Sequence, residues 1–173
     1  GKIIGGGFPL AALGASKDIM AHFDKAVVGQ DKWLMQLGTL SGNPVASVAG
    51  LKTMEILRRP GQYDRLRSIG QRLMDMHTEV LGEAGIAHQL SGDATLFDVY
   101  FTDADCVDYR SAKHRDTSVN DAWNAQLRAD GIFKSPGKLY PSLAITEACL
   151  EQTYEAMRAA AKSVSLGMSD KST

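Results

Sequence analysis

The amine of Lys2 stands beside a tight, glycine-rich turn, a setting in which a lysine can do covalent chemistry. Three glycines at positions 5–7 follow it, then Pro9 and an apolar run over residues 10–13. Glycines allow positive φ angles and close approach of the backbone to another group, and the apolar run predicts a buried strand after the turn. A desolvated lysine of lowered pKa is a nucleophile towards carbonyls. The alternative is an ordinary solvated lysine ahead of a glycine hairpin.

A second stretch, residues 38–44 (GTLSGNP), gathers small residues and two hydroxyls ahead of a predicted helix. Pro44 is a favoured first helical residue, so the backbone before it would face an open helix start. Such a start is a ready site for an anion such as phosphate. The same residues are equally typical of a simple helix cap, in which Ser41 or Asn43 accepts the first amide protons and no ligand is needed.

Residues 1–16 (GKIIGGGFPLAALGAS) resemble the active-site lysine segment of the class III aminotransferases, which are fold type I pyridoxal-phosphate enzymes. Within that family they are most similar to the glutamate-1-semialdehyde aminomutase branch. The resemblance implies that Lys2 is the catalytic residue and carries pyridoxal 5'-phosphate as a Schiff base. Residues 38–44 match a second signature of the family. By that resemblance Thr39, with the Gly38 backbone beside it, would bind the cofactor phosphate of the partner subunit across a homodimer interface.

The resemblance covers nearly the whole chain and implies its place in a larger fold. It is similar to the C-terminal part of a fold type I transferase, in which the end of an α/β large domain leads into a small α+β domain. The aromatic that stacks on the cofactor ring, the aspartate for its pyridine nitrogen and the main phosphate loop would lie upstream of Lys2. The implied activity moves an amino group between a small-molecule amine or amino acid and a keto acid or aldehyde.

Two alternatives to a plain aminotransferase stay open. Residues 131–146 (GIFKSPGKLYPSLAIT) are shorter than the equivalent segment of glutamate-1-semialdehyde 2,1-aminomutase and lack its glutamate, which favours a transaminase with another substrate. A non-catalytic protein could use the glycine-rich start and the Thr39 stretch as a phosphate-binding or interaction module. Within the later segment Lys134, Lys138 and Tyr140 are candidates for substrate recognition by position, although lysines on a turn are more often plain surface residues.

The composition is that of an ordinary globular protein and excludes several classes of function. The 173 residues carry a net charge of −1, so no charge excess supplies the attraction that nucleic acids or anionic membranes require. No apolar run approaches the roughly 20 residues that span a bilayer. Cys106 and Cys149 are far apart and the four histidines have no ligand spacing. This pattern predicts free thiols, a reducing cytoplasmic compartment and no metal site.

Periodicity and capping residues predict the elements that must position these groups. We expect helices over residues 17–23, 44–58, 62–82, 118–130 and 147–166, and strands over residues 85–90, 95–102, 132–134 and 139–145. Helices on one face of a small, mainly antiparallel sheet form an α+β layer, and Asp98 is expected on its outer face. A break at residues 59–61 divides the chain into the end of a large domain (1–59), a small domain (60–166) and a frayed tail (167–173).

Overall fold

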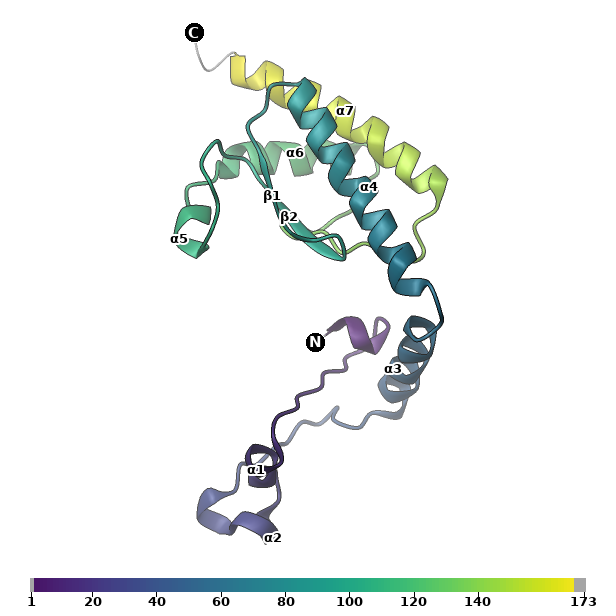
Figure 1. The fold of residues 1–173 in the computed structure, drawn as a ribbon, viewed down its shortest axis with the longest axis vertical. Coiled ribbons are helices and arrows are strands. Elements are labelled where there is room, and N and C mark those ends of the chain that lie inside the picture. Colours follow the sequence, from purple (N-terminus) through teal and green to yellow (C-terminus); the bar gives the residue numbers. More distant parts are fainter. Residues whose placement is uncertain (1, 170–173) are drawn as a thin grey trace. The chain divides into compact units, whose positions relative to one another are not determined.

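The computed structural model describes the backbone of residues 2–169 and the side chains of residues 3–167. The chain forms two compact units, Gly1–Gln62 and Tyr63–Thr173. Figure 1 shows the first unit in purple and blue, and the second in teal, green and yellow.

The first unit is organised by one long helix, α3, and otherwise consists of short helical turns, of which the 3-10 turns are written η. Its elements are η1 (Lys2–Gly5), α1 (Lys17–Met20), η2 (Ala21–Phe23), α2 (Lys25–Val28), η3 (Gln30–Lys32) and α3 (Pro44–Leu57). The buried strand predicted after the glycine turn is wrong, because residues 10–15 form no regular structure and residues 11–13 are exposed. The described part of this unit contains no strand with which that apolar run could pair.

The helix α3 begins where the sequence predicts, because Asn43 caps it and Pro44 is its first residue. The Asn43 side-chain oxygen accepts the N–H of Val45 at 2.9 Å and that of Ala46 at 3.3 Å. These are amides that a helix start otherwise leaves unpaired. The cap interpretation of Asn43 is therefore confirmed, and the first amides of α3 are already occupied.

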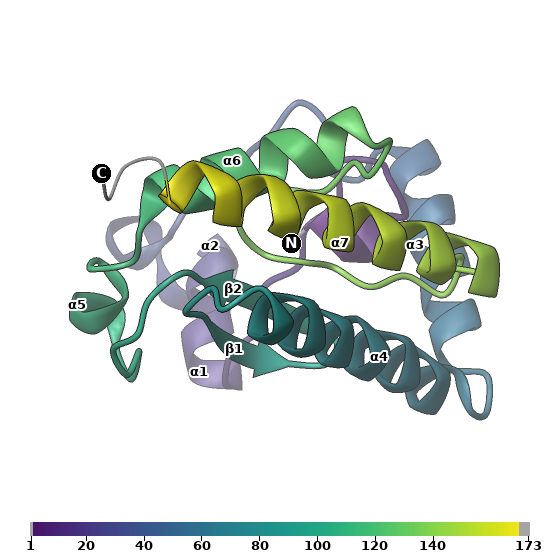
Figure 2. The ribbon, with the colours of Figure 1, turned by 90° about the horizontal axis from the view of Figure 1, so that it is seen from above.

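The second unit packs three long helices with a β-hairpin. Its elements are α4 (Gln62–Glu83), β1 (Gln89–Asp93), β2 (Leu96–Tyr100), α5 (Tyr109–Ala112), α6 (Thr117–Ala129) and α7 (Glu147–Ser169). The two strands pair antiparallel, with Ser91 opposite Asp98. The helix α6 packs along α7, as Figure 2 shows.

The core of the second unit draws side chains from every long element. The largest fully buried side chains are Trp123, Phe97, Leu81, Leu127, Leu150, Met157 and His77. The apolar stripe that periodicity predicts for α4 faces this core. Arg72, in the middle of α4, forms an ion pair with Glu147 at the start of α7, with 2.6 Å between its Nη1 and the Oε1 of Glu147.

The predicted four-stranded sheet is wrong, since the described residues form one two-stranded hairpin. Residues 85–88, expected to begin a strand, instead form the irregular segment that follows the end of α4 at Glu83. Gly85 adopts φ +66°, and the N–H of Ile86 donates to the carbonyl of Leu81 at 2.9 Å, a common way for a helix to stop. β1 consequently begins four residues later than expected, at Gln89.

Residues 132–134 and 139–145 are also not strands, and a single bridge between Phe97 and Leu139 remains of the predicted pairing. Pro136 and Pro141 lack the amide hydrogen that a strand ladder needs. Two helical features differ as well. A short helix that the sequence analysis does not predict, α5, forms between β2 and α6, and α7 continues through the predicted start of the frayed tail to Ser169. Residues 170–173 lie outside the described residues.

Candidate functional site

Lys2 begins η1, but its side chain lies outside the described residues, and the structure describes the glycine turn beside it. Gly6 and Gly7 adopt φ angles of +57° and +96°, which other residues rarely adopt. The N–H of Gly6 donates to the carbonyl of Ile3 at 3.2 Å, and the N–H of Phe8 donates to that of Gly5 at 3.0 Å. The chain therefore reverses direction directly after the candidate lysine.

The glycine turn packs directly against the helix α3. A Cβ on Gly6 would lie 2.6 Å from the hydroxyl oxygen of Thr53 and 3.3 Å from the carbonyl oxygen of Ala49. A Cβ on Gly50 of α3 would collide with the side chain of Leu10. Glycine at both positions lets the backbone of the lysine segment lie directly on the helix. The position of the Lys2 backbone is thus set by α3.

Gly38 and Thr39 lie in the turn that leads into the start of the same helix. The N–H of Ser41 donates to the carbonyl of Gly38 at 2.9 Å, and the N–H of Asn43 donates to that of Leu40 at 3.1 Å. Thr39 is exposed, and neither its hydroxyl nor its amide has a hydrogen-bond partner within the part of the chain that the structure describes. Both groups are available to a ligand from outside the turn.

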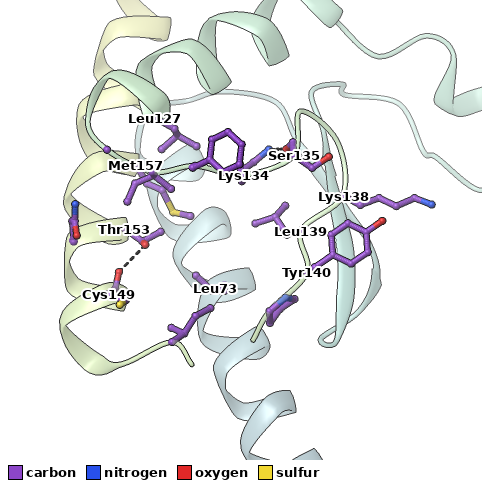
Figure 3. Close-up of a pocket in the computed structure, with 16 residues that line it drawn as sticks. Leu73, Leu127, Lys134, Ser135, Lys138, Leu139, Tyr140, Cys149, Thr153 and Met157 are labelled. Atoms are coloured by element: carbon purple, nitrogen blue, oxygen red, sulfur yellow. Dashed lines mark hydrogen bonds between the residues drawn. The ribbon is translucent and has the colours of Figure 1, made fainter. Parts of the chain in front are cut away.

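The second unit contains a cavity of about 470 Å³ between α4, α6, α7 and the segment at residues 131–141. Its floor consists of the buried side chains of Leu73, Leu127 and Met157. The candidates Lys134, Lys138 and Tyr140 all line it, but the Lys138 side chain extends away from the other residues in Figure 3. A cavity of this size accommodates a small molecule.

Lys134 is not the free surface lysine that a turn usually carries. It is half-buried, and its amine donates to the side-chain oxygen of Asn124 at 2.6 Å and to the carbonyl of Ser135 at 2.7 Å. Burial lowers the pKa of Lys134 to about 8, an effect that the negative charge of Asp98 opposes. At neutral pH the amine is therefore still mainly protonated and donates as an ammonium.

Asp98 differs from its expected place on the outer face of the sheet. Its side chain is only 13% exposed and lies 3.9 Å from the guanidinium of Arg115. Arg115 in turn lies over the ring of Tyr100, with 5.3 Å between the guanidinium carbon and the ring centre. Arg115 thus packs against the hairpin beside Asp98.

Sequence reasoning missed Asn124 of α6, and Cys149 and Thr153 of α7, as neighbours of the 131–141 segment. These residues are distant in sequence and meet it only through the packing of the helices. Asn124 forms hydrogen bonds with Lys134 and Pro136, and Cys149 and Thr153 line the cavity (Figure 3). One signal was present for Asn124, because it follows the buried Trp123 on a helix whose apolar stripe is otherwise regular. A buried amide requires hydrogen-bond partners, and such a partner is Lys134.

The described residues form neither a metal-binding cluster nor a membrane-spanning helix. No group of three or more histidine, cysteine, aspartate or glutamate side chains is placed there to hold a metal ion. None of the described helices is both long enough and apolar enough to cross a membrane.

Comparison with known proteins gives consistent results for sequence and fold. The chain is 35% identical over 162 residues to a glutamate-1-semialdehyde 2,1-aminomutase of Desulfosudis oleivorans, a match that covers 92% of this chain and 37% of that protein. It superimposes on an omega-transaminase of Sphaerobacter thermophilus with a TM-score of 0.78 and 31% identity, covering 95% of this chain and 37% of that one. A β-phenylalanine aminotransferase of Variovorax paradoxus gives a TM-score of 0.77 and 27% identity, over 92% and 36% of the two chains.

The chain spans a little over a third of the length of these relatives, about 37%. Its mixed helix and sheet structure is that of the C-terminal part of a fold type I pyridoxal-phosphate transferase. The model of the aminotransferase class-III family matches residues 1–161. From this match and these relatives, the chain belongs to the class III aminotransferase family.

Proposed function

We propose that this protein is a pyridoxal-phosphate-dependent aminotransferase that moves an amino group between a small-molecule amine or amino acid and a keto acid or aldehyde. The observation that carries the proposal is the arrangement around α3. The glycine turn after Lys2 lies on this helix, and the turn that carries Thr39 leads into its first residue. Two segments that resemble the signatures of one family therefore share a single structural support.

The residues around Thr39 fit a cofactor that carries a phosphate. Thr39 presents a hydroxyl and an amide without partners among the described residues, and turns with free N–H groups bind phosphate. In this proposal Thr39 and the Gly38 backbone would hold the phosphate of the partner subunit's cofactor, and the amine of Lys2 would bind pyridoxal 5'-phosphate covalently in its own subunit. When bound, the cofactor supplies an electron sink for negative charge at the substrate carbon.

Lys2 has two tasks in this proposal. Its amine would hold the cofactor covalently in the absence of substrate. The free amine then moves a proton at the substrate carbon, first as general base and afterwards as general acid. Contact with α3 holds the Gly6 backbone. The Lys2 amine would therefore perform both tasks without a movement of this backbone.

We further propose a homodimer in which Thr39 reaches the cofactor of the partner subunit. The surface of α3 supports an extended interface. Val45, Val48 and Leu51 are 57%, 66% and 72% exposed, although Ala46 and Gly50 on the same helix are buried. A helix that is apolar around its circumference is typical of one that is buried on more than one side.

The two compact units support a domain boundary near residues 59–61, with residues 1–59 at the end of the large domain and residues 60–166 as the small domain. Cys106 and Cys149 are free thiols, which fits a cytoplasmic location.

Borohydride reduction followed by peptide mapping tests the proposal on the intact protein. Reduction should fix a pyridoxyl group on the peptide that contains Lys2, and Lys2→Ala should lose both this adduct and turnover. Lys17→Ala is the matched control, because Lys17 is an exposed lysine of the same unit. Retained turnover in Lys2→Ala, or an adduct found only on another lysine, would contradict the proposal.

The aminomutase activity is a second candidate, which the 35% identity to glutamate-1-semialdehyde 2,1-aminomutases favours. An aminomutase converts its single substrate without a separate keto acid, whereas an aminotransferase requires both an amino donor and an acceptor. Assays with glutamate-1-semialdehyde alone and with paired donors and acceptors separate the two. A phosphate-binding module without activity would retain phosphate ligands in Lys2→Ala and turn over neither substrate set.

A further inference from the structure

Three successive backbone carbonyls, those of residues 135–137, are held by two side chains. The amine of Lys134 donates to the carbonyl of Ser135 at 2.7 Å and to that of Gly137 at 3.4 Å. The carbonyl between them, that of Pro136, accepts from the side-chain amide of Asn124 at 3.0 Å. Asn124 also offers its own oxygen to Lys134 at 2.6 Å, so the two side chains and the turn form one network.

The Lys134 amine has as many oxygen partners as it has N–H donors. A lysine ammonium has three N–H donors and no acceptor, and the Lys134 amine has three oxygen partners. All three partners are neutral carbonyl or amide oxygens. Oxygens of this kind also bind monovalent cations in proteins. The carboxylate of Asp98 adds a favourable charge interaction from outside this network.

The segment that contains the turn is anchored at both of its ends. The N–H of Ile132 donates to the carbonyl of Leu127 at 2.8 Å, and the N–H of Leu139 donates to the carbonyl of Phe97 at 2.7 Å. Between these anchors the chain forms no strand, and the prolines on either side of Leu139 prevent a continuous ladder. The network of Lys134 and Asn124 lies in this unpaired stretch.

We propose that Lys134 is a positioning residue whose ammonium acts as a built-in cation, holding the turn at residues 135–137 and thereby placing Lys138 and Tyr140 at the rim of the cavity. The hydrogen bonds that hold this turn all join residues of the second unit. That Lys138 and Tyr140 then contact substrate rests on the proposed function, whereas the cation network does not.

Hydrogen exchange of the full chain, read by mass spectrometry, tests the proposal with Lys134→Ala. Within residues 137–140 the amide of Leu139, which donates to the carbonyl of Phe97, should exchange about tenfold faster in the variant, because the turn before it loses the hydrogen bonds of Lys134. Exchange in α4 and α7 should stay unchanged. Lys113→Ala is the matched control, since Lys113 is an exposed lysine whose amine lies 4.8 Å from the centre of the Tyr109 ring. Unchanged exchange at residues 137–140 would overturn the proposal.

Chemical rescue separates a cation from a merely space-filling side chain. Propylammonium has the carbons and the charge that Lys134→Ala removes, and propanol has the same size without the charge. Propylammonium at millimolar concentration should restore slow exchange at residues 137–140 in Lys134→Ala, whereas propanol should not. Equal rescue by both compounds would show that filling space is sufficient and would overturn the role of the ammonium.

A measurement on the unaltered protein covers the case in which Lys134→Ala does not fold. Acylation of the native chain by a succinimidyl ester at neutral pH should modify Lys134 more slowly than Lys113. The lowered pKa of Lys134 leaves more of its amine unprotonated, but three hydrogen bonds and partial burial should protect it by more than this. Acylation of Lys134 as fast as Lys113 would mean that the network is not maintained in solution, and the proposal would fail.

Discussion

Gly6 lies so close to Thr53 of α3 that a Cβ added to it would stand 2.6 Å from the threonine hydroxyl oxygen. Its φ angle of +57° is also unfavourable for any residue with a side chain. We therefore expect Gly6→Ala to destabilise the lysine segment by about 1–3 kcal/mol. In the intact protein this should appear as faster loss of the cofactor, measured by dialysis and absorbance.

Gly14→Ala is the matched control for that prediction. A Cβ on Gly14 meets nothing within 4 Å, and its φ angle is not positive. Its cofactor retention should equal that of the unaltered protein. If both variants lose the cofactor at the same rate, the contact between the glycine turn and α3 does not position the lysine segment.

Thr39→Val tests the proposed phosphate contact. The change keeps the shape of the side chain but removes the hydroxyl, and a hydrogen bond to a charged group contributes about 1.5–3 kcal/mol. Cofactor dissociation should therefore become at least about tenfold faster. Thr78→Val removes a hydroxyl that donates only to the carbonyl of Met74 in its own helix, so it should change nothing. Unchanged dissociation in Thr39→Val would remove Thr39 from the site.

His77 should make the second unit sensitive to acid. Its side chain is fully buried, and burial, the largest cause, lowers its pKa from 6.5 to about 4. The hydrogen-bond contact with the carbonyl of Leu73, at 2.7 Å, opposes this shift, while the charges of Lys134 and His88 add to it. The unfolded chain therefore binds a proton near pH 6.5 and the folded chain only near pH 4. Stability is complete above the higher value and falls as the pH decreases towards the lower one, by about 3 kcal/mol.

Urea unfolding at pH 7.5 and pH 4.5 measures this loss. The unaltered protein should lose more stability between the two values than His77→Phe, which keeps an aromatic ring in the core without a titrating nitrogen. His114→Gln is the control, because His114 is exposed and should leave the pH dependence as it is. The same loss in His77→Phe as in the unaltered protein would assign the acid sensitivity to other groups.

Local signals in the sequence were sufficient for the long helices and insufficient for the sheet. The start of α3 follows from Asn43 and Pro44 alone, since a cap and a first-turn proline act within a few residues. The sequence predicts Ser118 as the cap of α6, which is two residues late, because the capping oxygen belongs to Asp116 and both residue types are good caps. Residue types alone do not decide between two such neighbours.

The predicted strands failed for a reason that lies outside local patterns. The apolar side chains of residues 132 and 133 suit a strand. The Lys134 side chain, however, forms hydrogen bonds with Asn124 and with the carbonyl of Ser135, and the segment pairs with no strand. Such pairing depends on helices that are distant in sequence, and tertiary contacts commonly override strand propensity. The candidate site shows the same division: the Lys2 and Thr39 segments were recognisable as short motifs, whereas the cavity residues converge only through packing.

Gly70 and Gly82 of α4 provide a last prediction, in which the same substitution should have opposite effects. The carbonyl of Ala94, in the hairpin turn, lies so close to Gly70 that a Cβ there would overlap with it. This turn is held in place, because Asp93 accepts the amide of Thr95 at 3.0 Å. Gly70→Ala should therefore lower the free energy of unfolding by about 1–3 kcal/mol, as overpacking usually does.

Gly82 lies on the same helix, but a Cβ there meets nothing within 4 Å. Gly82→Ala should raise the free energy of unfolding by about 0.5–1 kcal/mol, because alanine loses less backbone entropy in a helix. Thermal or urea unfolding of the two variants gives both values. Helix propensity alone would stabilise both variants, so stabilisation of Gly70→Ala would mean that the hairpin turn does not rest on α4 in solution. Opposite signs would show that backbone contact between the hairpin and α4 outweighs helix propensity at Gly70.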